Sequence, residues 1–287
     1  GGVHATVCPD WVIADPNVDV VVRNEGEYSF LEIVKRWAEG EPLDGVPGTT
    51  IKVDGQVIHH EQAPRIRNLD ELPFPARDLM PMHVYRANLA FPPTIRTRTT
   101  LYSARGCPYN CSFCSTAAVW GGHFCAMRSA SSVLDEIEEV IDRFGVYGFE
   151  FVDELTTLRK ERLVDFCQGI HDRGLHKMRW VCSSTVRQMD YETARMMKEA
   201  GCSMVYMGVE SGSPEILKTL NKQITVEQVV EAFDATRKAG LRRSACFMIG
   251  APGETAATVD ETIALAKRIK PERIALNVVT PYPGTEF

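Results

Sequence analysis

The chain has 287 residues and a formal net charge of −6, with 44% hydrophobic and 24% charged residues. This balance is ordinary for a globular protein, and the length allows one large domain plus a smaller piece. A negative charge without a basic run argues against nucleic-acid binding, and no apolar run predicts a membrane span. The nine cysteines are an odd number and no hydrophobic signal segment is seen, so we expect a cytoplasmic protein.

Residues 1–40 are predicted to form a separate front piece. A strand is expected at 18–23, a turn at Gly26 and a helix at 30–38. This order predicts the C-terminal part of a doubly wound α/β domain, and the chain reads as an excerpt of a longer protein. Residues 41–98 contain eight prolines, which predicts an extended linker, with a small hairpin at 49–58 around Asp54-Gly55.

Residues 99–287 alternate short apolar runs with amphipathic stretches, which predicts βα units, a parallel sheet and an open or partial (β/α)6 barrel. Strands are expected at 99–104, 148–152, 179–183, 203–209, 243–249 and 273–279. Helices are expected at 131–144, 159–173, 191–200, 214–220, 226–239 and 255–269. In the first helix, apolar residues recur at helical spacing, and Asp135, Glu136, Glu138 and Glu139 are expected on its solvated face.

Three cysteines follow the first strand with the spacing C-x3-C-x2-C: Cys107, Cys111 and Cys114. Four-iron clusters are usually held by four thiolates, so three cysteines leave one iron without a protein ligand. An open coordination position allows a metal centre to bind a small molecule, as open zinc sites do. A closed zinc site is the alternative, because His123 or Cys125 could supply a fourth ligand.

Ligands of parallel α/β folds bind at the carboxyl ends of the strands. The second strand ends at Asp153 and Glu154, where a carboxylate leaving an apolar strand needs a partner or caps the next helix. The third ends at Ser183 and Arg187, which suit either a charge-assisted pair with a cofactor carboxylate or a solvated turn.

The later strand ends carry glycine and one acidic residue. Glu210, between Gly208 and Ser211, could accept both hydroxyls of a ribose. Gly250 and Gly253 would let the backbone approach a planar ring, or would serve a turn before the next helix. Phe113, inside the cysteine loop, is expected either to pack locally or to cover a cofactor.

Together these segments resemble the radical S-adenosylmethionine (SAM) family over about residues 99–287. The resemblance rests on the cysteine loop, the Gly-Val-Glu-Ser-Gly run and the Gly-Ala-Pro-Gly-Glu-Thr run. It implies a radical SAM partial barrel and a [4Fe-4S] cluster on the three cysteines. The SAM site that it implies comprises Phe113, Asp153, Glu154, Ser183, Arg187, Gly208, Glu210, Ser211, Gly250 and Gly253. Glu154 and Thr156 depart from the family pattern Asp-Asp-x-Phe-Thr.

The front piece resembles the last two strand-end loops of a cobalamin-binding domain. With the linker, it resembles the cobalamin-binding radical SAM proteins, which include class B methyltransferases and the anaerobic magnesium-protoporphyrin monomethyl ester cyclase. The residues implied for cobalamin are Gly1, Gly2, Glu25, Gly26 and Glu27. His4 is not assigned as a cobalt ligand, and Cys125 stands where relatives often have Arg.

The resemblance implies reductive cleavage of SAM to a 5′-deoxyadenosyl radical, for cobalamin-dependent methylation of an unactivated carbon. Oxidative cyclisation is the alternative within the group, and a non-catalytic zinc or corrinoid-binding module is the alternative from another class. Methylthiotransfer to tRNA is disfavoured by the charge and by the lack of an RNA-binding domain. A small-molecule substrate and an electron donor such as flavodoxin or ferredoxin are the expected partners.

Overall fold

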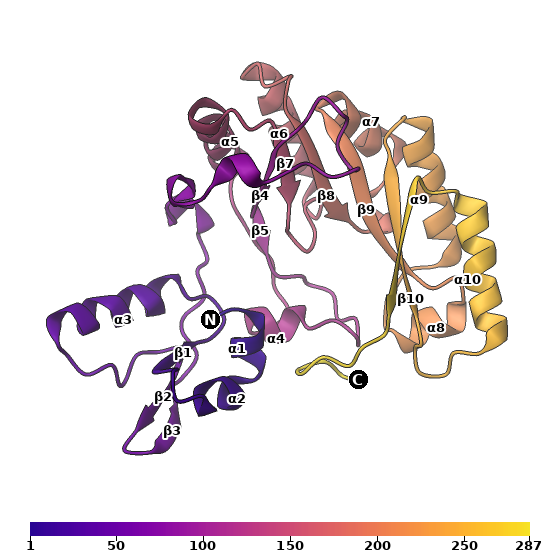
Figure 1. Ribbon diagram of the computed structural model, residues 1–287. Helices are drawn as coiled ribbons and strands as arrows, with labels where there is room; N and C mark the ends of the chain where they lie inside the picture. The colour runs from indigo at the N-terminus through magenta and orange to yellow at the C-terminus, as the bar shows by residue number, and fades with distance from the viewer.

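The computed structural model describes residues 1–287, which form a small front unit and a larger sheet unit (Figure 1). The larger unit contains a six-stranded sheet in the order β11-β10-β9-β8-β7-β4, and all neighbouring strands are parallel. The strands are β4 (Arg98–Leu101), β7 (Gly148–Phe151), β8 (Arg179–Ser184), β9 (Cys202–Glu210), β10 (Arg243–Ile249) and β11 (Arg273–Val278). Because β4 and β11 lie at opposite edges, the barrel is open, which confirms the predicted α/β partial barrel.

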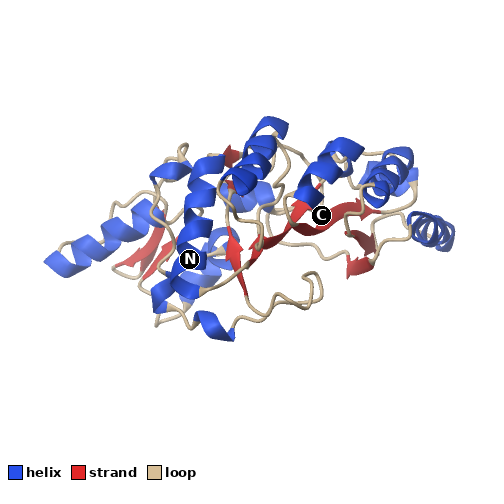
Figure 2. Ribbon diagram, turned by 90° about the horizontal axis from the view of Figure 1, so that it is seen from above, coloured by secondary structure: helices blue, strands red, loops and turns tan.

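The helices of the larger unit gather along one side of the sheet (Figure 2). They are α5 (Ala130–Phe144), α6 (Lys160–Asp172), α7 (Tyr191–Glu199), α8 (Pro214–Thr219), α9 (Val226–Lys238) and α10 (Ala256–Ile269). A core cluster of 35 buried residues, including Phe149, Trp180 and Phe233, lies between the helices and strands. Burial of each large apolar side chain contributes about 1.5–3 kcal/mol, so this layer accounts for most of the apolar stabilisation.

Glu136 of α5 is buried, so the prediction that it lies on a solvated face is wrong. It is 1% exposed and forms ion pairs with Arg77, at 2.6 Å, and with Arg128. Arg77 comes from the proline-rich segment, which crosses this side of α5. The pattern of α5 alone could not reveal the contact, because its partner lies 59 residues earlier.

The front unit contains α1 (Val3–Val7), α2 (Pro9–Ala14), β1 (Val20–Val22), α3 (Glu27–Glu39), β2 (Thr49–Val53) and β3 (Gln56–His59). The expected hairpin around Asp54 and Gly55 is confirmed, and both residues have positive φ, 50° and 79°. Strand β2 also pairs with β1 in antiparallel fashion. The hairpin therefore belongs to the front sheet and does not lie in an extended linker, so the front unit continues past residue 40.

The remaining proline-rich segment packs against the larger unit. Ala90 and Phe91 are buried against Val181 of β8 and Met204 of β9. Nearby, Arg242 donates hydrogen bonds to the carbonyl oxygens of Leu89 and Ala90. The segment, which was predicted as an extended linker, is thus held against the sheet unit. No helix in the structure is both long enough and apolar enough to cross a bilayer.

Candidate functional site

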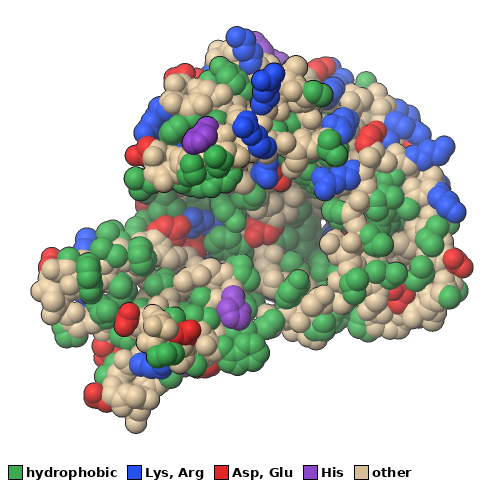
Figure 3. Space-filling model, viewed as in Figure 1, with side chains coloured by type: hydrophobic (Ala, Val, Ile, Leu, Met, Phe, Trp, Pro, Cys, Tyr) green, Lys and Arg blue, Asp and Glu red, His purple; other side chains and the backbone are tan.

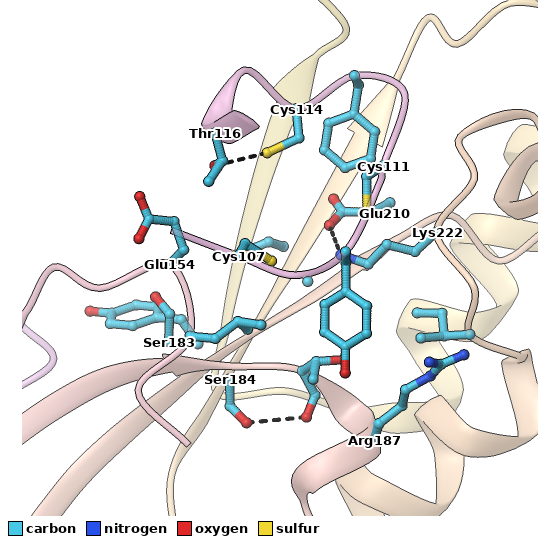
Figure 4. A pocket seen from close by; sticks show the side chains of 18 residues that line it. Cys107, Cys111, Cys114, Thr116, Glu154, Ser183, Ser184, Arg187, Glu210 and Lys222 are labelled. Carbon is cyan, nitrogen blue, oxygen red and sulfur yellow. Dashed lines mark hydrogen bonds and ion pairs between the residues drawn. The ribbon is translucent and has the colours of Figure 1, made fainter. Parts of the chain in front are cut away.

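A cavity of about 290 Å³ lies between the cysteine loop and the carboxyl ends of the central strands (Figure 4). Nine of the residues predicted for cofactor binding line it. They are Cys107, Cys111, Phe113, Cys114, Glu154, Ser183, Arg187, Gly208 and Glu210. The fold therefore brings together side chains from four segments that are far apart in the sequence.

The cysteine loop is fastened at both ends by one carboxylate. It starts after β5 (Ala104–Arg105), which pairs with β6 (Ala126–Met127), and leads into α4 (Thr116–Trp120). Glu154, after β7, accepts hydrogen bonds from the Gly106 amide at 3.1 Å and from the Trp120 indole. Gly106 has φ +85°, and a Cβ there would lie 2.4 Å from a backbone oxygen, so only glycine fits this turn.

The three thiols lie partly buried around the same cavity. Burial raises the pKa of Cys107 and raises that of Cys111 to about 11, although Lys222 opposes this effect at Cys111. The Sγ atom of Cys114 lies 3.1 Å from the Thr116 hydroxyl. No three His, Cys, Asp or Glu side chains converge on a single-ion site. A four-iron cluster, in contrast, takes each thiolate on a different iron, so the donor set fits a cluster better than a closed zinc site.

Glu210 and Lys222, both in the cavity lining, form a nearly buried ion pair with an Nζ–Oε1 distance of 2.7 Å. The backbone of Glu210 has φ 64°, a left-handed conformation that is uncommon outside glycine. Burial alone would lower the pKa of Lys222, but the effect of Glu210 is opposite, and the pKa is raised overall. The lysine therefore stays charged. A Cβ at Gly208 would lie 2.5 Å from Glu210 Oε1 and 2.7 Å from Lys222 Nζ. The sequence analysis missed Lys222, because no local pattern links it to Glu210.

Another part of the cavity lining is tied to the cysteine loop through Tyr109. Gln188 donates a hydrogen bond of 3.2 Å to the Tyr109 hydroxyl, and the Arg187 guanidinium lies 5.7 Å from the Tyr109 ring centroid. Arg187 also donates to the carbonyl oxygen of Gln223. Ser183 adds a hydroxyl to the lining. A cationic and a polar side chain therefore flank the cavity on this side.

Four predicted residues do not line the cavity: Asp153, Ser211, Gly250 and Gly253. Asp153 is 2% exposed, and its carboxylate accepts hydrogen bonds from the amides of Ser103, at 2.7 Å, and Ala104, at 2.9 Å. Ser211 bonds Thr262 at 3.1 Å. Gly250 and Gly253 have φ 88° and 80° in the turn before α10. In this structure Asp153 and Ser211 anchor neighbouring chain segments, and contact of all four with a cofactor stays a prediction.

The front unit has a cavity of its own, of about 410 Å³, lined by Gly1, Gly2, Gly26 and Glu27 among others. Glu25 is not part of its lining. It is buried, and its carboxylate pairs with Arg105 at 2.9 Å and accepts the Ile66 amide at 3.0 Å. Figure 3 shows the molecule hollowed between the front unit and the sheet unit. Cobalamin binding in the front cavity stays a prediction.

Among curated proteins, the chain is 37% identical to an uncharacterized methyltransferase of Pyrococcus horikoshii, over 100% of the chain and 61% of the relative. It is 30% identical to the anaerobic magnesium-protoporphyrin IX monomethyl ester cyclase of Cereibacter sphaeroides, over 99% of the chain and 47% of the relative. The chain therefore spans about half the length of these relatives.

Two solved structures share the fold. The radical SAM methyltransferase TsrM of Kitasatospora setae, with cobalamin and a [4Fe-4S] cluster bound, aligns with a TM-score of 0.79 and 20% identity, covering 98% of this chain and 55% of TsrM. The cobalamin-dependent radical SAM enzyme OxsB aligns with a TM-score of 0.77 and 21% identity, covering 93% of this chain and 38% of OxsB. The family model of the Radical SAM superfamily matches residues 101–266. The chain therefore belongs to the radical SAM superfamily, as the cysteine loop and strand ends predicted, and its fold is shared by cobalamin-dependent members.

Proposed function

We propose that this chain carries the [4Fe-4S] and SAM sites of a cobalamin-dependent radical SAM methyltransferase. The observation that carries the proposal is the cavity in which Cys107, Cys111 and Cys114 meet the Glu210–Lys222 ion pair. Three thiols fit a cluster with one open iron. A buried cation and a buried carboxylate beside them fit a zwitterionic ligand that also carries a ribose.

The residues would divide the work as follows. The three cysteines would hold the cluster, and Phe113 would cover it. Glu210 has one carboxylate oxygen on Lys222, which leaves the other for ribose hydroxyls. Lys222 and Arg187 would bind the carboxylate end of SAM and Ser183 its amino end, with Glu154 keeping the loop in place. Of the remaining predicted residues, Asp153 and Ser211 would support the walls, and Gly250 and Gly253 would flank the adenine.

The cofactors supply the hard chemistry: an electron for reductive cleavage of SAM, the resulting 5′-deoxyadenosyl radical, and a methyl group from cobalamin. The residues of the chain would orient the cofactors and enclose them. Half-buried thiols, the apolar lining from Leu155 and Ile224, and the tie between Tyr109 and Gln188 reduce water access to the cavity. Exclusion of water protects reactive species from side reactions.

Methyl transfer is preferred to oxidative cyclisation because the more similar of the two curated relatives is named a methyltransferase, at 37% against 30% identity. The cyclase reaction stays the second candidate, since that relative matches almost the whole chain. The front cavity would form part of the cobalamin site through Gly1, Gly2, Gly26 and Glu27. The substrate would be a small molecule, the electron donor a flavodoxin or ferredoxin, and the compartment the cytoplasm.

The test is anaerobic reconstitution with iron and sulfide, reduction in the presence of SAM, and chromatography of 5′-deoxyadenosine. We expect the unaltered chain to turn brown and to release 5′-deoxyadenosine. Cys111→Ala should lose both the brown colour and at least about 99% of the product, because a missing thiolate removes a cluster ligand.

Cys8→Ala is the matched control, since Cys8 is also partly exposed but belongs to the front unit. It should keep the colour and the product. Retention of full colour and SAM cleavage by Cys111→Ala would refute the assigned ligand set. A colourless protein that retains zinc and shows no SAM affinity would favour the structural-metal alternative.

A further inference from the structure

The loop from Asn24 to Glu27 faces two ways. Asn24, Gly26 and Glu27 line the front cavity. The same Asn24 reaches the other unit, because its side-chain amide donates hydrogen bonds to the carbonyl oxygens of Val119, at 2.9 Å, and Ala118, at 3.4 Å. Both carbonyls belong to α4, which directly follows the cysteine loop. One loop therefore borders the front cavity and also holds the segment after Cys114.

Arg105 forms the second connection between the units. One guanidinium nitrogen lies 2.9 Å from Glu25, and the other pairs with Glu27. The side chains of Arg105 and Glu25 are only 14% and 4% exposed. Charge-assisted hydrogen bonds in such surroundings are strong, and the fork of arginine allows one side chain to hold two carboxylates.

Arg105 is also connected to the cysteine loop, through its backbone and through its side chain. It directly precedes Gly106 and Cys107, and its guanidinium lies 5.5 Å from the ring of Trp120. Trp120 and Gly106 donate hydrogen bonds to the same carboxylate, that of Glu154, which lines the cluster cavity. The residues that border the front cavity thus hold both the start and the end of the cysteine loop.

We propose that Arg105 is a positioning residue that couples the front cavity to the cluster cavity through a clamp made of Asn24, Glu25, Glu27 and Arg105. Occupation of either cavity restricts the clamp, and the restriction reaches the other cavity through Gly106 and α4. The proposal rests on the proposed function in taking the front cavity as a corrinoid site and the other as the cluster and SAM site. It adds a direct mechanical connection between them, centred on Arg105, which lines neither cavity.

The first test needs no cofactor. In R105Q/E25Q both charges of the buried pair are removed, so no buried charge is left unpaired. We expect amide hydrogen exchange at residues 107–120 to be about tenfold faster than in the unaltered chain, since local opening follows the loss of these bonds. Unchanged exchange there would overturn the proposal. If R105Q/E25Q does not fold, E27Q replaces it, with a smaller expected increase of about threefold because Glu27 is 37% exposed.

R195Q/E199Q is the matched control. Arg195 also holds two carboxylates, Glu192 and Glu199, but on the exposed surface of α7. This variant should leave exchange at residues 107–120 unchanged. Equal acceleration in both variants would mean that the faster exchange is a general effect of removing charges, and it would also overturn the proposal.

The second test measures whether loading of the cluster cavity affects the loop beside the front cavity. Each protein is reconstituted with iron and sulfide and given SAM, and exchange is measured at residues 24–27. Loading should slow exchange there at least about threefold in the unaltered chain, and should have no effect there in R105Q/E25Q. Equal slowing in both would overturn the coupling. If the unaltered chain takes up no cluster, the proposed function fails, while the cofactor-free measurement still decides whether the clamp holds the loop.

Discussion

The Glu210 side chain is held in place before any ligand arrives. Its positive φ of 64° costs of order 1–3 kcal/mol, a strain that persists only where the surroundings determine the conformation. The surroundings here are Lys222, at 2.7 Å, and Gly208, which has no side chain to fill the space beside the pair. The backbone strain is therefore coupled to a preorganised carboxylate in the cavity, as expected for a binding residue.

Gly208→Ala tests this arrangement with one methyl group. Gly208 does not need a positive φ, so the backbone tolerates alanine, and the effect arises only from contact of the Cβ with Glu210 and Lys222. We expect the affinity of the reconstituted chain for SAM to fall about tenfold, or about 1.4 kcal/mol. Anaerobic equilibrium dialysis measures the affinity, and urea unfolding serves as the control for overall stability. An unchanged affinity with the same urea midpoint would place the ion pair outside the SAM site.

Residues in short motifs were predictable and residues paired over long distances were not. The three cysteines and Glu210 stand in local patterns with a chemical meaning, so the sequence analysis found them. Lys222 pairs with a residue 12 positions away, and Arg105 with residues 80 and 78 positions away. Such pairs depend on which strand ends and loops meet in space. Sequence spacing carries no signal for that.

Hydrophobic periodicity in the sequence predicted most of the helices and strands of the larger unit. Apart from the first strand, each of its predicted helices and strands ends within one residue of the expected position. Helices α1, α2 and α4 were missed, since five or six residues display little of a helical period, although α8, with six residues, was predicted. The first strand was expected to run to Ala104 but breaks after Leu101, where Ser103 and Ala104 donate their amides to Asp153.

Asp190 is the N-cap residue of α7. Its carboxylate accepts the Thr193 amide at 2.7 Å, and this backbone bond is the main cause that lowers the pKa of Asp190. Asp190→Ala should reduce the free energy of unfolding by about 1 kcal/mol at pH 7. Because the pKa is lowered in the folded state, the stabilisation is present at neutral pH and is lost as the pH falls below about 4.

Urea unfolding of Asp190→Ala and Asp190→Asn at pH 7 and pH 3 checks this. Asparagine keeps the cap without the charge, so Asp190→Asn should lose less than Asp190→Ala at pH 7 and should not follow the same pH dependence. The exposed pair of Asp190 with Lys160 contributes little to the comparison. A difference between the alanine variant and the unaltered chain that grows as the pH falls would contradict the capping assignment.

At the scale of the whole molecule, the proline-rich segment binds to the sheet unit through charge as well as apolar contact. Arg77 donates to the Thr100 carbonyl at 2.9 Å and pairs with Glu136 at 2.6 Å, and the side chains of Arg77 and Glu136 are nearly inaccessible. Arg128 takes the other oxygen of Glu136. One carboxylate thus balances two guanidinium groups. Its loss would leave two buried cations facing each other.

Glu136→Gln should therefore cost about 3–5 kcal/mol of the free energy of unfolding, the range for breaking a buried pair by removing one partner. The loss should be concentrated where Arg77 enters, so residues 61–97 should become sensitive to limited proteolysis before the sheet unit unfolds. Glu139→Gln is the control, because Glu139 lies on the same helix and pairs with Arg143 at the surface. Its cost should stay below about 1 kcal/mol. Equal costs for the two variants would mean that the segment is held by Phe91 and its apolar neighbours alone, and that the charges merely accompany that packing.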